Sequence, residues 1–389
     1  MSGPLDHLVS STDVGGVNRA RVMRALYRHG PLSRSQLARH LGVSRATITA
    51  VVQPLLTDAA LRELPQRAAS AQGGKPPKPL WFGSDTTIGA VYLAADAVTV
   101  ALVAKDGSVL RRRDVAFTDG RDVDDVLGTL REALGLFRGE SLLGIGVGMA
   151  GMIDTSEGRV LASHRAPSLN GLPLAEHVTA WFDVPVYVDH HPRVQAIGDQ
   201  WFGLGRDLED FVSVFTGEVL GAGMVMSGHV VRGPDGAGGE AGHMVLDARG
   251  TRCECGRRGC WETVATLPWL RAESARAGVP EPSSASSARL TRLAREGSQP
   301  AEDVLDRYAR NIAEGMANLD QLLGLGHYIV HGDAVGGGEE MRARIAGHLE
   351  RSAPHRGAAP VVILAEPSDE STILGAAGLV LSRVYSYSL

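Results

Sequence analysis

Three cysteines and one histidine, all between residues 243 and 260, restrict the folding of this 389-residue chain more than any other part of it. Three thiolates and one imidazole form a complete tetrahedral set for Zn²⁺. We therefore expect a closed, structural zinc site with no open position for a catalytic water; the alternative is a chance cluster. Gly256 and Gly259 would let the backbone fold the sulfurs around one ion. The four predicted ligands are His243, Cys253, Cys255 and Cys260.

Two carboxylates flank this cluster closely in the sequence. Glu240 precedes His243 by three residues and Glu262 follows Cys260 by two, so a bound metal would hold both side chains in place. Paired carboxylates on a rigid frame suit the recognition of vicinal hydroxyl groups through charge-assisted hydrogen bonds. The alternative is that both are exposed acidic residues beside a zinc site.

The charge of the chain is divided unevenly between its two ends. Residues 1–80 contain eleven Lys or Arg and four Asp or Glu, a net charge of +7, whereas the rest of the chain carries −12 and the whole chain −5. A basic amino-terminal part on an acidic body predicts contact with a polyanion at one end only. An Arg-rich solvated surface is the alternative.

The composition excludes several classes of protein. With 44% hydrophobic and 21% charged residues, most of the chain is globular and neither disordered nor fibrous. No apolar run approaches the roughly 18 residues that a membrane span needs, and the first residues do not resemble a signal peptide. We expect a cytoplasmic protein of two or three folding units, with no membrane partner and no disulfide framework.

The basic part has the pattern of a helix-turn-helix. Apolar spacing and helix breakers predict helices at residues 17–29, 34–40 and 45–56, with Gly42 in the turn between the last two. Ser33 and Ser44 stand at the expected N-caps. Pro54 falls inside the third helix and should bend it or end it a turn early. The side chains expected in the core of this part are Leu37, Val43, Ile48 and Val51.

The third helix would present its outer face to DNA. Arg45 can donate two hydrogen bonds to a guanine edge, and the methyl groups of Thr49 and Ala50 can touch a thymine methyl. Ser44 and Thr47 suit backbone phosphates. The Gly-Gly-Lys-Pro segment that follows is either a wing entering a minor groove or a flexible linker, and an ordinary three-helix packing module is the alternative for the whole part. The candidate DNA contacts are Ser33, Arg34, Ser44, Arg45, Ala46, Thr47, Thr49 and Lys75.

The rest of the chain reads as a two-lobed α/β domain. Buried strands lead into Gly-rich turns and helices, a pattern typical of lobes that hold a ligand cleft between them. Residues 280–287 read as a surface loop. Strands are expected at residues 88–103, 109–117, 143–149, 186–188, 211–215, 222–226, 328–331 and 361–364, and helices at 123–137, 302–323, 339–351 and 371–384.

The segments Gly239–His243 and Cys253–Glu262 together resemble the signature of the ROK family, which contains repressors, open reading frames and sugar kinases. The amino-terminal part resembles that of the repressor branch. The resemblance implies an actin-like, ribonuclease-H-like fold, a sugar-derived ligand, and dimers or tetramers on palindromic operators. It divides the chain into a winged helix-turn-helix at 1–65, a linker at 66–83 and a ROK domain at 84–389. The ligand contacts that it implies are Gly151, Asn170, Glu240, His243 and Glu262.

The sequence departs from the kinase members of the family at three places. The Asp-x-Gly-Gly-Thr phosphate loop is replaced by Tyr92–Asp96, and the Gly-Thr-Gly turn by Gly217–Val219, whose central glutamate would repel a triphosphate. The Glu-Asn-Asp-Ala-Asn motif is replaced by Asp189–Arg193, with His191 at the position of the catalytic base. These losses together predict a protein that is not an enzyme. Unless they are satisfied loop residues, the further candidate ligand contacts are His190, His191 and Arg193.

We therefore predict a DNA-binding transcriptional repressor that forms a homodimer or homotetramer on operator DNA and responds to a small carbohydrate-like effector. One alternative is a sugar kinase that phosphorylates a hexose or amino sugar with ATP and carries an appended DNA-binding domain. Another is a constitutive DNA-binding protein whose body serves only to oligomerise.

Overall fold

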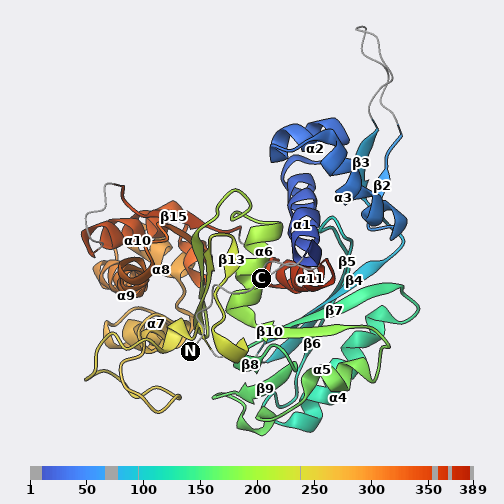
Figure 1. The fold of residues 1–389 in the computed structure, drawn as a ribbon. Coiled ribbons are helices and arrows are strands. Elements are labelled where there is room, and N and C mark those ends of the chain that lie inside the picture. Colours follow the sequence, from blue (N-terminus) through green and yellow to red (C-terminus); the bar gives the residue numbers. More distant parts are fainter. Residues whose placement is uncertain are drawn as a thin grey trace, which may run out of the picture.

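The computed structural model describes residues 11–65, 78–94, 96–236, 238–352, 358–366 and 370–385. A small head of three helices and one antiparallel sheet, in the order β1-β3-β2, stands on a body of two α/β lobes (Figure 1). This is the predicted winged helix-turn-helix on a two-lobed, actin-like body, and the predicted fold class is confirmed. The head contains α1 (Ser11–His29), β1 (Leu32–Ser33), α2 (Arg34–Leu41), α3 (Arg45–Thr57), β2 (Leu61–Glu63) and β3 (Pro79–Phe82).

The three predicted helices of the head are confirmed, with both serine caps. The Ser33 hydroxyl accepts a hydrogen bond from the Gln36 backbone N–H, and the Gln36 side chain accepts one from the Ser33 backbone in return, so α2 begins with a capping box. The expectation that Pro54 ends α3 a turn early is wrong, because α3 continues through it to Thr57; a bend there stays a prediction. Val43 was expected in the core but is 41% exposed; Val52 and Leu55 of α3 are buried instead.

The predicted linker is only partly described. Residues 66–77, which include the candidate contact Lys75, lie outside the described residues. Residues 79–82, which the sequence places at the end of the linker, form strand β3 and pair antiparallel with β2 and β1. Glu63 on β2 pairs with Arg34 on α2 at 2.7 Å and with Lys78 at 2.8 Å. The strands β2 and β3 are thereby tied to α2, while the predicted domain boundaries stay a prediction.

The first lobe is built on a five-stranded sheet in the order β10-β7-β4-β5-β6. The predicted single strand at 88–103 is in fact two strands, β4 and β5, joined by a turn. Helix α4 packs against β5 and β6, and α11 packs against β7 and β4. The elements are β4 (Thr87–Leu93), β5 (Ala97–Val103), β6 (Val109–Ala116), α4 (Val123–Ala133), β7 (Leu142–Met149), β8 (Met152–Asp154), β9 (Arg159–Ala162), α5 (Leu174–Thr179) and β10 (Val186–His190).

The second lobe is built on a sheet in the order β13-β12-β11-β14-β15. The helices α8 and α10 pack against the long helix α9 on this lobe (Figure 1). Among the residues that the structure describes, none of the helices combines the length and the apolar character that crossing a bilayer requires. The elements are β11 (Phe211–Thr216), β12 (Leu220–Met226), β13 (His229–Val230), α7 (Leu267–Arg276), α8 (Ser287–Arg295), α9 (Gln299–Leu323), β14 (His327–Gly332), α10 (Gly338–Ser352) and β15 (Val361–Leu364).

Two helices, α6 (His191–Trp201) and α11 (Ser371–Val384), lie together between the two sheets. Every residue of α6 is buried, because the helix contacts β11 and β12 as well as α11. Two glycines bring the helix backbones into contact. A Cβ on Gly198 would lie 2.0 Å from the Ser371 carbonyl oxygen, and one on Gly375 would lie 1.8 Å from that of Val194, so neither position accepts a side chain.

The head is packed against the ends of this helix pair. The Tyr27 ring of α1 meets Trp201 and Phe202 edge-on, at centroid distances of 5.2 and 5.1 Å, and its hydroxyl donates to the carbonyl of Lys105. Arg28 forms an ion pair with Asp207. One hydrophobic core therefore runs from the head into α6 and α11.

Candidate metal centre and interlobe cleft

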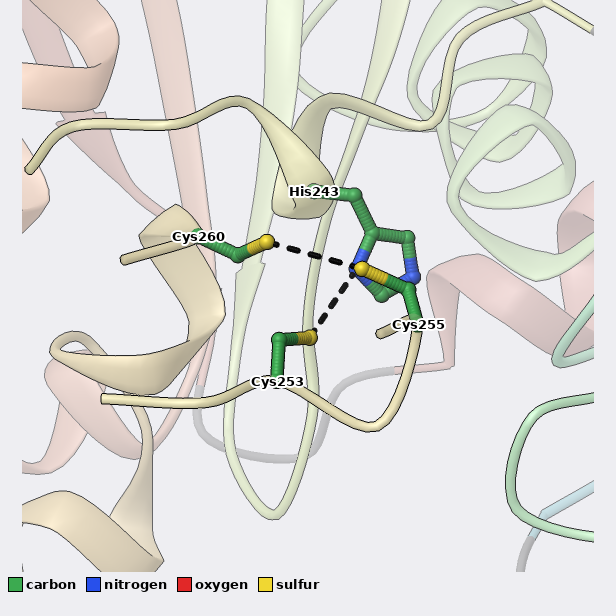
Figure 2. Close-up of side chains that lie close together, drawn as sticks. All are labelled: His243, Cys253, Cys255 and Cys260. Carbon is green, nitrogen blue, oxygen red and sulfur yellow. Dashed lines mark hydrogen bonds between the residues drawn. The ribbon is translucent and has the colours of Figure 1, made fainter. Parts of the chain in front are cut away.

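The structure brings the four predicted metal ligands together. One ligand atom of each residue lies within 4.8 Å of all the others, and the four side chains point to a common centre (Figure 2). The Cys253 sulfur lies 3.5 Å from the His243 Nδ1, and the Cys255 sulfur 3.6 Å from the Cys260 sulfur. A tetrahedral ion with bonds of about 2.3 Å places its ligand atoms about 3.8 Å apart, so the four residues fit such an ion.

The loop that carries the sulfurs depends on two glycines. Gly256 has a φ of +89° and Gly259 a φ of +67°, a conformation that favours glycine. A Cβ on Gly259 would lie 1.6 Å from the Asp247 carbonyl oxygen, so this residue also permits a close approach of the backbone. The role expected for both glycines is confirmed.

Two of the three thiols lie in surroundings that disfavour a free thiolate. Burial and a hydrogen bond to Glu262 raise the pKa of Cys253, and burial together with the neighbouring Cys255 raises the pKa of Cys260. Metal binding requires thiolates, so a cation at the centre would supply the charge that offsets both effects. The chemistry of the donor set thus suits a soft divalent metal.

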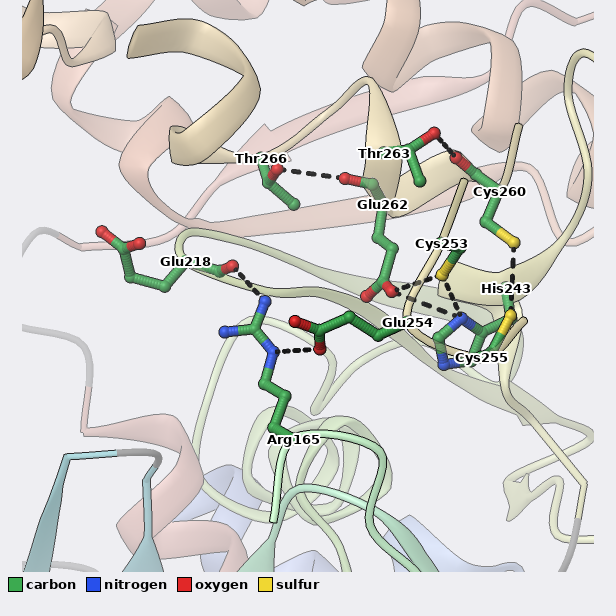
Figure 3. A network of polar contacts seen from close by, with 10 residues as sticks. All are labelled: Arg165, Glu218, His243, Cys253, Glu254, Cys255, Cys260, Glu262, Thr263 and Thr266. Carbon is green, nitrogen blue, oxygen red and sulfur yellow. Dashed lines mark hydrogen bonds and ion pairs between the residues drawn. The ribbon is translucent and has the colours of Figure 1, made fainter. Parts of the chain in front are cut away.

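The two flanking carboxylates have different neighbours. Glu262 lies beside the metal ligands, with Oε1 3.0 Å from the Cys253 sulfur and 3.4 Å from the His243 Nδ1 (Figure 3). Glu240 lies 3.2 Å from the Nδ1 of His190. Burial raises the pKa of Glu240 to about 7, so this carboxyl group can hold a proton near neutral pH.

A cleft between the lobes brings most of the predicted ligand contacts together. One exception is Asn170, which is exposed and does not line the cleft; its Oδ1 accepts a hydrogen bond from the Ser163 N–H at 2.7 Å and so positions a segment that does. Arg193 is also outside, because it is fully buried and held by Asp189 at 2.7 Å. The predicted residues that line the cleft are Gly151, His190, His191, Glu240, His243 and Glu262.

His191 opens helix α6 and is not a loop residue. Its ring lies 6.0 Å from Tyr92 and 5.6 Å from Phe215, and the side chain is 3% exposed. Neither ring nitrogen has a hydrogen-bond partner among the described residues. Burial and the nearby Arg193 lower the pKa of His191 to about 3, so the ring is neutral and a weak base at physiological pH.

The structure adds cleft residues that the sequence did not indicate. His164 and Arg165 line the cleft from a segment without a recognisable motif, and Glu254 lines it from between the metal ligands Cys253 and Cys255. Arg165 of the first lobe donates to the Glu218 carbonyl of the second at 2.9 Å and lies 3.6 Å from a Glu254 carboxylate oxygen (Figure 3). The Glu218 carboxylate pairs with Arg271 at 2.7 Å, which partly offsets the repulsion expected for a triphosphate.

The proposed DNA-reading face of α3 is accessible. Arg45, Ala46 and Thr47 are exposed, and Ser44 caps the helix by accepting from the Thr47 N–H at 3.0 Å. Thr49 is exposed too, but its hydroxyl donates to the Arg45 carbonyl at 2.9 Å, which leaves the methyl group for contact. No ion pair involves Arg45 within the described residues.

Two of the candidate DNA contacts at the start of α2 are already engaged. Ser33 is 2% exposed and its hydroxyl serves the capping box, so we withdraw it as a surface contact. Arg34 is partly buried and bound to Glu63, and it is less available than Arg45.

Comparison with known proteins gives two family matches. A model described as the ROK family matches residues 88–383, and one described as the MarR family matches residues 17–58. The chain is 28% identical over 314 residues to a glucokinase of Thermotoga maritima, with 76% of this chain and 97% of that one covered. It is 24% identical over 391 residues to a xylose repressor of Caldicellulosiruptor bescii, with 95% and 97% covered.

One solved structure superposes on nearly the whole chain. It is described as a ROK family transcriptional regulator and homologue of the Escherichia coli MLC protein. It superposes with a TM-score of 0.76 at 24% identity and covers 96% of this chain and 99% of its own. At this identity the likeness concerns the fold.

Proposed function

Because the chain belongs to the ROK family, we propose that it is a transcriptional repressor whose head binds operator DNA and whose interlobe cleft binds a small carbohydrate effector. The observation that carries this proposal is the path of α6. The helix begins at His191 in the cleft and ends at Trp201 against the head. An effector that binds two arrangements of the lobes with different affinity would shift the head between them.

The proposal includes Zn²⁺ at the cysteine and histidine cluster. The metal would be held by four protein side chains and would have a structural role, keeping Glu262 and the cleft loop in place. It also includes a homodimer or homotetramer in the cytoplasm, with half-sites about one helical turn of DNA, or a multiple of it, apart.

The test is fluorescence anisotropy with duplexes from the gene's own upstream region, with and without a panel of sugars. We expect specific binding at moderate salt that one sugar weakens. Arg45→Ala should weaken specific binding, whereas Arg138→Ala, which removes an exposed arginine from the body, should not. If no duplex is bound specifically, with or without sugars, the proposal is contradicted.

A sugar kinase with an appended DNA-binding domain is the second candidate. The 28% identity to a glucokinase over nearly its whole length favours it. Against it stand the low pKa of His191, which makes a poor base at neutral pH, and the replaced phosphate turns. Coupled ATP consumption with hexoses and N-acetyl-hexosamines separates the two; turnover that His191→Ala abolishes would favour the kinase.

A constitutive DNA-binding protein is the third candidate, in which the body no longer binds a ligand. A thermal-shift screen with sugars addresses it, because a ligand that binds only the folded state must raise the unfolding temperature. Specific DNA binding without any sugar-dependent shift would favour this candidate over the repressor that we propose.

A further inference from the structure

A second cavity adjoins the cleft beside the metal centre. The two cavities share Ala150, Ser163, Arg165 and Val219 in their walls, so one ligand can occupy both. The volume of the second cavity is about 1530 Å³ and that of the cleft about 620 Å³, and both volumes include space that is open to solvent. It lies between the β4–β5 turn and the β11–β12 turn, the two places where the sequence departs from the phosphate-binding motifs of the kinases.

The walls of the second cavity are mainly apolar. Four charged side chains also line it: Arg165 binds the Glu218 carbonyl, the Glu218 carboxylate pairs with Arg271, and Asp96 and Arg121 carry opposite charges. An apolar group gains free energy by leaving water for walls of this kind. The apolar and aromatic side chains that line the cavity include Leu93, Phe117, Val126, Met149, Leu169 and Phe215.

His191 lies where the two cavities meet. Its ring lines the cleft, while its ring neighbours Tyr92 and Phe215 line the second cavity. The ring is nearly fully buried, and both nitrogens lack a hydrogen-bond partner within the described residues. A buried polar group without a partner is costly, so the neutral imidazole, with one donor and one acceptor, is ready for a polar atom of a ligand that passes this point.

We propose that the effector is a glycoside with an aromatic aglycone. The sugar ring occupies the cleft near Glu240 and His190, the glycosidic oxygen lies beside His191, and the aglycone fills the second cavity. This inference rests on the proposed function, because it requires that the cleft binds a sugar. It adds the chemical class of the group attached to that sugar.

The experiment is titration calorimetry on the full chain with matched pairs of methyl and 4-nitrophenyl glycosides of glucose, xylose and N-acetylglucosamine. For at least one sugar, the aryl glycoside should bind about tenfold or more tightly than the methyl glycoside, because the additional ring is buried against apolar side chains. Ala94→Phe places a ring in the second cavity from the β4–β5 turn and should remove this advantage while methyl glycoside binding is kept.

Thr118→Phe is the matched control, because it adds the same ring at an exposed position that follows the lining residue Phe117 but does not itself line the cavity. Methyl glycoside binding also reports whether each variant is folded. Aryl glycosides that bind no more tightly than methyl glycosides, or an advantage that survives Ala94→Phe, would overturn this inference and leave the proposed function standing. If none of the six glycosides binds, both the inference and the proposed sugar-sensing function are refuted.

Discussion

The Tyr27 ring should carry much of the free energy that holds the head on the body. Tyr27→Ala removes the edge-on contacts with Trp201 and Phe202 and the hydrogen bond to the Lys105 carbonyl. An aromatic pair contributes about 0.5–1.5 kcal/mol beyond the buried area, and a hydrogen bond a net of about 0.5–1.5 kcal/mol. The docking free energy should therefore fall by about 1.5–4.5 kcal/mol, the sum of these three contacts.

Hydrogen–deuterium exchange measures this loss directly. Amides of α2 and α3 that exchange when the head detaches should do so roughly tenfold to a thousandfold faster in the variant, since about 1.4 kcal/mol corresponds to a factor of ten. Amides of β11 and β14 in the second lobe should keep their rates. Tyr27→Phe keeps the rings, loses only the hydroxyl, and should accelerate exchange by about tenfold at most.

Two results would refute this reasoning. Unchanged exchange of α2 and α3 in Tyr27→Ala would mean that the ring contacts do not hold the head. Equal acceleration in β11 and β14 would mean that head and body open as one unit, and that Tyr27 contributes to global stability only.

Three further predictions concern the metal, the DNA and the cleft. Cys255→Ser should lose the bound metal, measured by elemental analysis, and retained metal would contradict the ligand set. Arg45→Ala should weaken operator binding by about 1–3 kcal/mol and non-specific binding by much less; equal losses in both would assign Arg45 to phosphate contact. Burial raises the pKa of Glu240 from its ordinary 4.5 to about 7, so the folded state binds this proton more tightly than the unfolded chain does. The stability that the proton gives is complete below pH 4.5 and is lost as the pH rises to 7. Relative to the wild type, Glu240→Gln should therefore be more stable at pH 7.5 than at pH 5 in urea unfolding, and a pH-independent difference would contradict this.

The metal centre was predictable because its ligands are close in sequence. His243 and Cys260 are 17 positions apart, and three cysteines with one histidine are the residue types of a tetrahedral zinc site. The head was predictable for a similar reason, since its caps and turn act locally. The prediction that Pro54 ends α3 early was wrong because Pro54 lies near the end of α3, where the loss of one hydrogen bond does not stop the helix.

The cleft was harder to predict because its parts meet only in the folded chain. Helix α6 has no amphipathic pattern, since α11 and the second sheet bury it on all sides, and its first residue was therefore read as part of a loop. The turn between β4 and β5 contains Ala94 and Asp96 but no glycine or proline, so two strands looked like one. Arg165 reaches the cleft by tertiary packing that no local signal indicates.

The glycine contacts between α6 and α11 limit how the body can respond to anything bound in it. At Gly198 and Gly375 the two backbones touch, so no side chain there can change its rotamer to absorb a displacement. A shift imposed on the first turn of α6 must then carry α11 with it as a single rigid unit. Substituting either glycine would separate these helices. The coupling between the cleft and the head should be the first property lost, because the residues that contact DNA or bind metal lie elsewhere.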